Sequence, residues 1–165
     1  MIEDKIVERF QKIVRHQKYI ETYERLQNLE EDRKFCGHDM EHFLSVARIS
    51  YLMVLEKKLD ISKDIIYATA LLHDLGRADQ YENGISHEEA GAVLANEILT
   101  DCGYSMEEKN FMIDTILKHR NMKDDVDNFA SIFYHADKIS RDCIHCKARK
   151  ECYWPEEKKN NKYIY

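Results

Sequence analysis

The chain is nearly devoid of the residues that build tight turns. It contains 5 glycines and 1 proline in 165 residues. A fold of many short strands needs frequent tight turns, which these residues usually supply. Their scarcity favours helices joined by few connections, so the expected fold class is all-α.

Apolar residues recur at helical spacing in successive segments, and several segments begin at a capping residue. Ser62, Ser86 and Ser105 each precede one, and the last two stand three residues before a glutamate, as in a capping box. Gly76 is a natural helix stop, and residues 77–85 after it are expected to form a loop. The expected helices lie at 2–33 (as one helix or two), 38–59, 63–76, 87–101, 106–119 and 126–140.

The size and composition of the chain are those of one folded domain. Hydrophobic residues make up 44% and charged residues 34% of the sequence, as in globular proteins. No apolar run is long enough to cross a bilayer, and the first residues carry acids and lack the apolar run of a signal peptide. We expect a single domain over residues 1–165, a cytoplasmic location, and cysteines that are thiols or metal ligands rather than disulfides.

Ionisable side chains fall on the apolar faces of three of these helices. One histidine precedes apolar residues at spacings of four, seven and eleven, and an aspartate stands on the apolar stripe of the last helix. A carboxylate that points inward loses its hydration, which costs free energy unless a cation or hydrogen-bond donors compensate. Four residues at the inner ends of three helices would compensate together by sharing a metal ion: His42, His73, Asp74 and Asp137.

Each of these residues taken alone has a simpler interpretation. A histidine on an apolar face is more often a hydrogen-bonded core residue than a ligand, and His73 with Asp74 is a common dipeptide. For Asp137 alone, a buried ion pair with Arg141 one turn later is the stronger interpretation. The ordered set, His then His-Asp then Asp on three helix ends, is what favours a metal site.

Three segments, EHFLSVARIS, ALLHDLGR and YHADKISR, together resemble the HD superfamily of metal-dependent phosphohydrolases. The resemblance spans residues 36–141 and implies a compact multi-helix HD-domain bundle, with residues 1–35 as an N-terminal helical extension and residues 142–165 as a cysteine-containing tail. The metal-ligand positions that it implies are His42, His73, Asp74 and Asp137.

Part of the pattern is similar to the diadenosine tetraphosphate hydrolase group of HD proteins. In that group, histidines at places comparable to His87 and His119 bind a second ion. A histidine at a helix end is also common without a metal, and His119 would interact favourably with the C-terminal dipole of its helix. The spacing favours neither one ion nor two.

The resemblance implies hydrolysis of a phosphate ester or anhydride of a small molecule, a nucleotide by family analogy. Nitrogen and oxygen ligands suit Mn, Fe, Ni, Co, Mg or Zn, and such an ion activates a water molecule. Asp74 would orient or deprotonate that water, and Arg77 and Lys138 are the expected phosphate contacts. Surface solvation is the stronger interpretation of any single one of these cations, and other nearby cations are Lys118, Arg120 and Arg141.

Four of the five cysteines flank the expected core. One lies six residues before His42 and another six residues after Asp137, so their segments should lie close together if these two ligands meet at a metal. Two of them form a C-x-x-C pair, which alone is a weak signal. Structural zinc, an iron–sulfur cluster and reduced thiols all stay open for Cys36, Cys143, Cys146 and Cys152, whereas Cys102 is unrelated.

Other functions and partners stay open at this point. The alternatives are a metal-binding regulatory module without catalysis and a diiron oxygenase on the same fold. The net charge of -6 argues against membranes and duplex nucleic acid as partners, but not against a small phosphorylated substrate at a cation. The N-terminal helices could cover the cleft or make a homodimer contact. His38 could face the cleft or the surface, and no role is expected for His16, His135 and His145.

Overall fold

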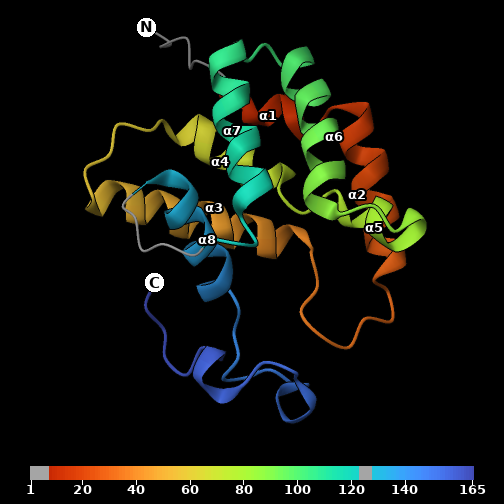
Figure 1. Ribbon diagram of the computed structural model, residues 1–165, viewed down its shortest axis with the longest axis vertical. Helices are drawn as coiled ribbons and strands as arrows, with labels where there is room; N and C mark the ends of the chain where they lie inside the picture. Colours follow the sequence, from red (N-terminus) through yellow and green to blue (C-terminus); the bar gives the residue numbers. More distant parts are fainter. Residues whose placement is uncertain (1–7, 123–127) are drawn as a thin grey trace, which may run out of the picture.

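The computed structural model describes residues 8–122 and 128–165, and these residues contain α-helices and short 3-10 turns but no strand (Figure 1). The all-α class expected from the sequence is confirmed. The elements are α1 (Phe10–Ile13), α2 (Gln17–Leu29), α3 (Met40–Glu56), α4 (Lys63–Leu72), α5 (Arg77–Asn83), α6 (His87–Asp101), α7 (Met106–Lys118), α8 (Phe129–Ile139), η1 (Arg149–Glu151) and η2 (Glu156–Lys158).

The helices pack around two apolar clusters, and α3 and α4 contribute to both. The first cluster joins α1 to α7 through residues such as Leu26, Leu72 and Ile98. The second joins α3, α4 and α8 through residues such as Val46 and Phe133. Helix α3 lies against α4 and α8, and α7 lies against α4, α6 and α8 (Figure 1). Several helix ends are therefore brought toward the C-terminal end of α4.

The capping serines begin their helices as expected, with one difference. The side chains of Ser62, Ser86 and Ser105 each accept a hydrogen bond from a first-turn amide. Ser105 and Glu108 form a complete capping box. The capping box expected between Ser86 and Glu89 is incomplete. The Ser86 hydroxyl donates to Glu88 at 2.8 Å, and the Glu89 side chain does not accept from the Ser86 amide.

The prediction of a loop at residues 77–85 is wrong, because most of this segment forms α5. Gly76 was interpreted as a helix stop, yet it has a right-handed helical backbone, with φ of -61°, and caps α5. Because glycine has no Cβ, the backbone at this position can pack closely against the start of α6. A Cβ there would lie 2.0 Å from the carbonyl oxygen of His87. Gly84, with φ of 71°, ends α5, and α4 itself ends at Leu72.

The two ends of the helical region also differ from the expected bounds. The N-terminal segment forms two helices, and His16 lies between them as the cap of α2, with its ring accepting from the Lys18 amide. The last helix begins at Phe129, after Asn128 caps it, and the expected start at Val126 lies outside the described residues. No helix of the described ranges has the length and apolar character needed to cross a bilayer.

Arg9 ties the N-terminal segment to two later helices. Its guanidinium donates to Asp64 at 3.0 Å and makes two bonds to Glu108, at 2.6 and 2.7 Å. The bonds from Arg9 to Glu108 hold the pKa of that carboxyl at about 2, although partial burial opposes the shift. A carboxyl with a lowered pKa stabilises the fold above its ordinary pKa near 4.5 and loses that contribution as the pH falls toward about 2.

The variant Glu108→Gln is expected to lower the free energy of unfolding at pH 7 by about 1 kcal/mol, because the amide keeps the capping geometry but loses the charged bond. It should also flatten the fall in that free energy between about pH 4.5 and 2. Urea unfolding at a series of pH values measures both. The exposed neighbour Glu107→Gln is the matched control and should keep the pH dependence.

Candidate metal centre

Six buried side chains meet where the ends of five helices come together, and we call them the histidine–aspartate centre. Helices α3, α6 and α8 each contribute one of them. The other three stand at the C-terminal ends of α4 and α7, where the helical hydrogen bonding stops. The six residues are His42, His73, Asp74, His87, His119 and Asp137, each no more than 8% exposed.

Four of the residues form a first group whose ligand atoms all lie within 4.8 Å of one another. The Nε2 atom of His42 is 3.2 Å from an Asp137 oxygen and 3.5 Å from Asp74 Oδ2. The Nε2 atom of His73 is 3.0 Å from Asp74 Oδ2 and 3.8 Å from the same Asp137 oxygen. These four residues are the ones that the ordered pattern in the sequence assigned to a single metal site.

The other oxygen of Asp74 faces a second group. Its Oδ1 atom lies 3.7 Å from His87 Nε2 and 3.6 Å from His119 Nε2. The two histidine nitrogens are 3.3 Å apart, and the ligand atoms of this group also lie within 4.8 Å of one another. Asp74 is therefore shared by both groups, with one oxygen toward each.

The histidines at the ends of α4 and α7 are oriented by their own helices. His73 Nδ1 lies 2.7 Å from the Ala70 carbonyl oxygen, and His119 Nδ1 lies 2.5 Å from that of Ile116. A carbonyl oxygen only accepts, so each ring donates from Nδ1 and directs the lone pair of Nε2 into the centre. Both carbonyls stand in the last turn, where a helix leaves its carbonyls without helical partners.

His42 is oriented through α8. The Ser140 hydroxyl donates to the Asp137 carbonyl oxygen at 2.7 Å, which leaves its own oxygen to accept from His42 Nδ1 at 3.3 Å. The ring nitrogen that faces the carboxylates, His42 Nε2, has no hydrogen-bond partner, and neither has His73 Nε2. An unpaired buried nitrogen costs about 1–3 kcal/mol. Nitrogen and oxygen donors with unpaired lone pairs fit a divalent metal ion.

Burial and charge in the centre favour a cation at the same place. Burial would raise the pKa values of Asp74 and Asp137, but the surrounding histidines and cations hold both well below the usual range. Burial would lower the pKa of His73, yet the two carboxylates outweigh it and raise this pKa to about 9. Burial lowers the pKa of His87 to about 3 and keeps that ring neutral. Because a proton and a metal compete for the same lone pair, carboxylates that attract the one also attract the other.

Three further residues lie near the centre, and of these the glutamates Glu30 and Glu88 were not expected from the sequence. His38, left open between cleft and surface, is buried, and its Nε2 lies 3.7 Å from Asp74 Oδ2. Its Nδ1 is 2.5 Å from Glu30, which also accepts from the His38 amide and from Tyr81. Glu88 lies 3.3 Å from His87 Nδ1. The four-residue spacing of His38 and His42 could have indicated that His38 faces the centre. No such pattern distinguishes Glu30 from the other glutamates near the end of α2.

The cations expected near the centre separate into two sets. Arg77 Nε donates to Asp74 at 2.9 Å, and Lys138 Nζ donates to Asp137 at 2.9 Å. The others have different partners: Lys118 pairs with Asp114, Arg120 lies 3.9 Å from Glu88, and Arg141 donates to the Gly37 carbonyl at 2.5 Å.

The Arg141 contact also removes the simpler interpretation of Asp137. The buried ion pair between these two residues is not formed, and the Asp137 carboxylate instead faces Lys138 and the two histidines of the first group. The four flanking cysteines lie around a separate cavity, and Cys102 is buried in the apolar core.

The chain is thus a helical protein with a buried histidine–aspartate centre whose ligand atoms could hold metal ions. Residues 39–142 match the HD domain family, and the chain belongs to this family. A Clostridium beijerinckii protein, named only as uncharacterized, is 46% identical over 159 residues, which covers 96% of this chain and 100% of that protein.

Two more distant comparisons concern part of the sequence and the fold. Ribonuclease Y of Mycoplasma mycoides is 32% identical over 101 residues, 61% of this chain but 22% of that enzyme. The solved structure described as a predicted HD superfamily hydrolase from an uncultured Thermotogales bacterium has a TM-score of 0.60. It is 22% identical and covers 85% of this chain and 80% of its own, so this likeness concerns the fold alone.

Proposed function

We propose that this protein is a metal-dependent phosphohydrolase that cleaves a phosphate ester or anhydride of a small molecule, a nucleotide in particular. The proposal rests on one observation, the buried Asp74 carboxylate shared between two groups of ligand atoms. The HD family and the unpaired histidine nitrogens support it. The assignment to the diadenosine tetraphosphate hydrolase group is the finer part of the proposal, and His87 and His119 beside Asp74 are what favour it.

The first group would hold one ion and the second group another, with Asp74 as a ligand of both. Bound divalent ions would lower the pKa of a water molecule and neutralise charge on a phosphate oxygen. The low pKa of Asp74 makes this carboxylate a weak base, so its role is to hold the water rather than to take its proton.

His38 is the better candidate to accept that proton. Burial lowers its pKa despite the nearby carboxylates, so its ring is neutral at pH 7. Glu30 accepts from Nδ1 and leaves the Nε2 lone pair directed toward Asp74. A neutral ring in this position can take up a proton and release it again.

Replacing His38 with glutamine is expected to lower kcat by about ten- to a hundredfold, while the metal content stays unchanged. The acidic side of the pH–rate profile should change in His38→Gln and also in Glu30→Gln, since Glu30 positions the ring. Turnover over a pH series, with metal analysis of the same samples, measures this. The exposed His145→Gln is the control, and an unaltered pH profile in both site variants would refute the role.

Arg77 and Lys138 touch the carboxylates of the centre while staying partly open to solvent, with side chains 22% and 35% exposed. They can therefore reach a substrate phosphate from the rim. Arg77→Met or Lys138→Met should each reduce kcat/KM by about a hundredfold, because a charged donor is lost. Lys118→Met, which removes an exposed cation paired with Asp114, should change little. Near-normal turnover in the double Met variant would remove both residues from the assignment.

A substrate panel tests the function itself. Nucleotides, dinucleoside polyphosphates, phosphate monoesters and a short RNA are incubated with the protein and Mn or Fe, and phosphate or nucleotide release is measured. The RNA is included because ribonuclease Y is among the relatives. Turnover should disappear with a chelator and return with metal. No turnover across the panel with metal bound would favour a regulatory module, and oxygen consumption would instead indicate an oxygenase.

A further inference from the structure

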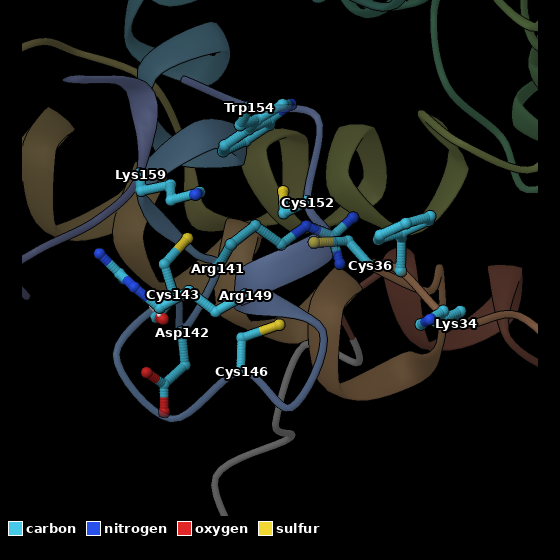
Figure 2. A pocket seen from close by; sticks show the side chains of 11 residues that line it. Lys34, Cys36, Arg141, Asp142, Cys143, Cys146, Arg149, Cys152, Trp154 and Lys159 are labelled. Carbon is cyan, nitrogen blue, oxygen red and sulfur yellow. Dashed lines mark hydrogen bonds between the residues drawn. The ribbon is translucent and has the colours of Figure 1, made fainter. Parts of the chain in front are cut away.

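A second cluster of potential ligands lies outside the histidine–aspartate centre. A cavity of about 250 Å³ is lined by all four cysteines that flank the core. One comes from the segment before α3 and three from the C-terminal segment after α8, and Figure 2 shows their side chains together with those of Arg141 and Arg149. The cysteines are Cys36, Cys143, Cys146 and Cys152, and all are free of disulfides.

Cations surround this cavity. Lys34, Arg141, Arg149 and Lys159 line it, against a single acidic lining residue, Asp142. Some of these charges are balanced outside the lining, because Lys34 pairs with Glu151 and two others pair with Glu156. Arg141 donates to the neutral carbonyl of Gly37, a contact that leaves its charge uncancelled. The negative charge of four thiolates exceeds the positive charge of a zinc ion or of a common four-iron cluster core. A loaded site would therefore be anionic, and the cations that line the cavity would stabilise it.

The spacing of the sulfurs distinguishes the two ligands. Tetrahedral zinc with Zn–S bonds of about 2.3 Å brings its four sulfurs within roughly 4 Å of one another. In the described parts of the chain, the groups of three or more ligand atoms within 4.8 Å of one another are the two of the histidine–aspartate centre, and the four cysteines form no such group. The cavity is also large, since about 10–15 Å³ is enough for one water-sized occupant.

We propose that Cys36, Cys143, Cys146 and Cys152 hold a [4Fe–4S] cluster that joins the C-terminal segment to the segment before α3. The cluster places a body of iron and sulfide between the thiolates, which matches sulfurs that surround a cavity at a distance from one another. When a preformed cluster is transferred from a thiolate carrier, each cysteine sulfur bonds to one iron, a carrier thiolate leaves that iron, and the cysteine's proton passes to the leaving thiolate. No sulfur or iron changes oxidation state in this exchange.

Such a cluster would add a cross-link to a C-terminal segment that has little regular secondary structure. After α8 the chain forms only the two short turns η1 and η2 in its described part, and Cys143 and Ala148 are its buried apolar residues. Cys36 stands two residues before His38, and the C-terminal segment follows the helix of Asp137. The cluster would therefore fix the two segments that border the histidine–aspartate centre.

The test is chemical analysis of the full chain purified under nitrogen. About four irons and four acid-labile sulfides per chain are expected, beyond any iron at the histidine–aspartate centre, with broad visible absorbance that bleaches in air. Sulfide is the decisive quantity, because the histidine–aspartate centre binds none. Cys146→Ser should lose the sulfide and the absorbance, whereas Cys102→Ala and the double variant His42→Ala/His73→Ala should keep both.

Zinc at one per chain without sulfide, or four metal-free reactive thiols in protein handled without oxygen, would overturn the proposal. If Cys146→Ser does not fold, the sulfide content of the unmodified protein still decides the question. This outcome is independent of turnover, so the cluster and the proposed hydrolase activity can fail separately.

Discussion

Asp74→Asn is expected to abolish turnover and to strip the metal from both groups of the centre. The amide keeps the size of the side chain but replaces one charged oxygen with a nitrogen that cannot bind an ion. Asp74 offers one oxygen to each group, so the change removes the ligand of one group and leaves the other group with a neutral, weaker one. Losing several kcal/mol of charge stabilisation corresponds to on the order of a thousandfold in rate.

Metal analysis and turnover on the best substrate of the panel measure this result together. Asp114→Asn is the matched control, because Asp114 is an exposed aspartate that pairs with Lys118. The control should keep both metal and turnover. A folded Asp74→Asn protein that retains a large share of its activity would contradict the shared role of this carboxylate.

The second large effect is expected at Gly76, where a helix connection touches α6. A Cβ at this position would meet the His87 carbonyl oxygen at 2.0 Å and the Gly91 amide at 2.5 Å, both of them backbone atoms that cannot swing aside. Gly76→Ala should therefore reduce the free energy of unfolding by about 3 kcal/mol or more. Thermal unfolding should show a loss on the order of 10 °C.

Gly91→Ala is the control for this prediction, because it adds the same methyl group on the other side of the contact. There a Cβ would find its nearest neighbour, Ile116, at 3.6 Å, an ordinary contact. A helix interior also favours alanine over glycine by up to about 1 kcal/mol, so this variant should be neutral or slightly more stable. Equal losses in the two variants would show that the backbone contact is not the cause. Gly76→Ala should also weaken metal binding at His87, since the displaced backbone is its own.

The fold class and the proximity of the four residues of the first group could be predicted because their signals are local. The capping serines mark helix starts. A carboxylate on the apolar stripe of a helix will be buried whichever helix packs against it, so its lost hydration must be compensated by a cation. Helix α5 was missed because Gly76 has two explanations in a sequence, a left-handed stop or a close approach, and only packing distinguishes them. The role of Glu30 could not be predicted either, since nothing local separates it from neighbouring glutamates until the segment before α3 folds back onto it.

Both histidines that end helices, His73 and His119, take their direction from a carbonyl three residues earlier in the same helix. At these two positions, the hydrogen bond that directs the ligand nitrogen is therefore contained within one helical turn. A short helix ending in such a histidine is a portable unit. Grafted onto an unrelated helical scaffold, it should present its imidazole nitrogen at the same angle, which makes these two helix ends starting material for designed metal sites.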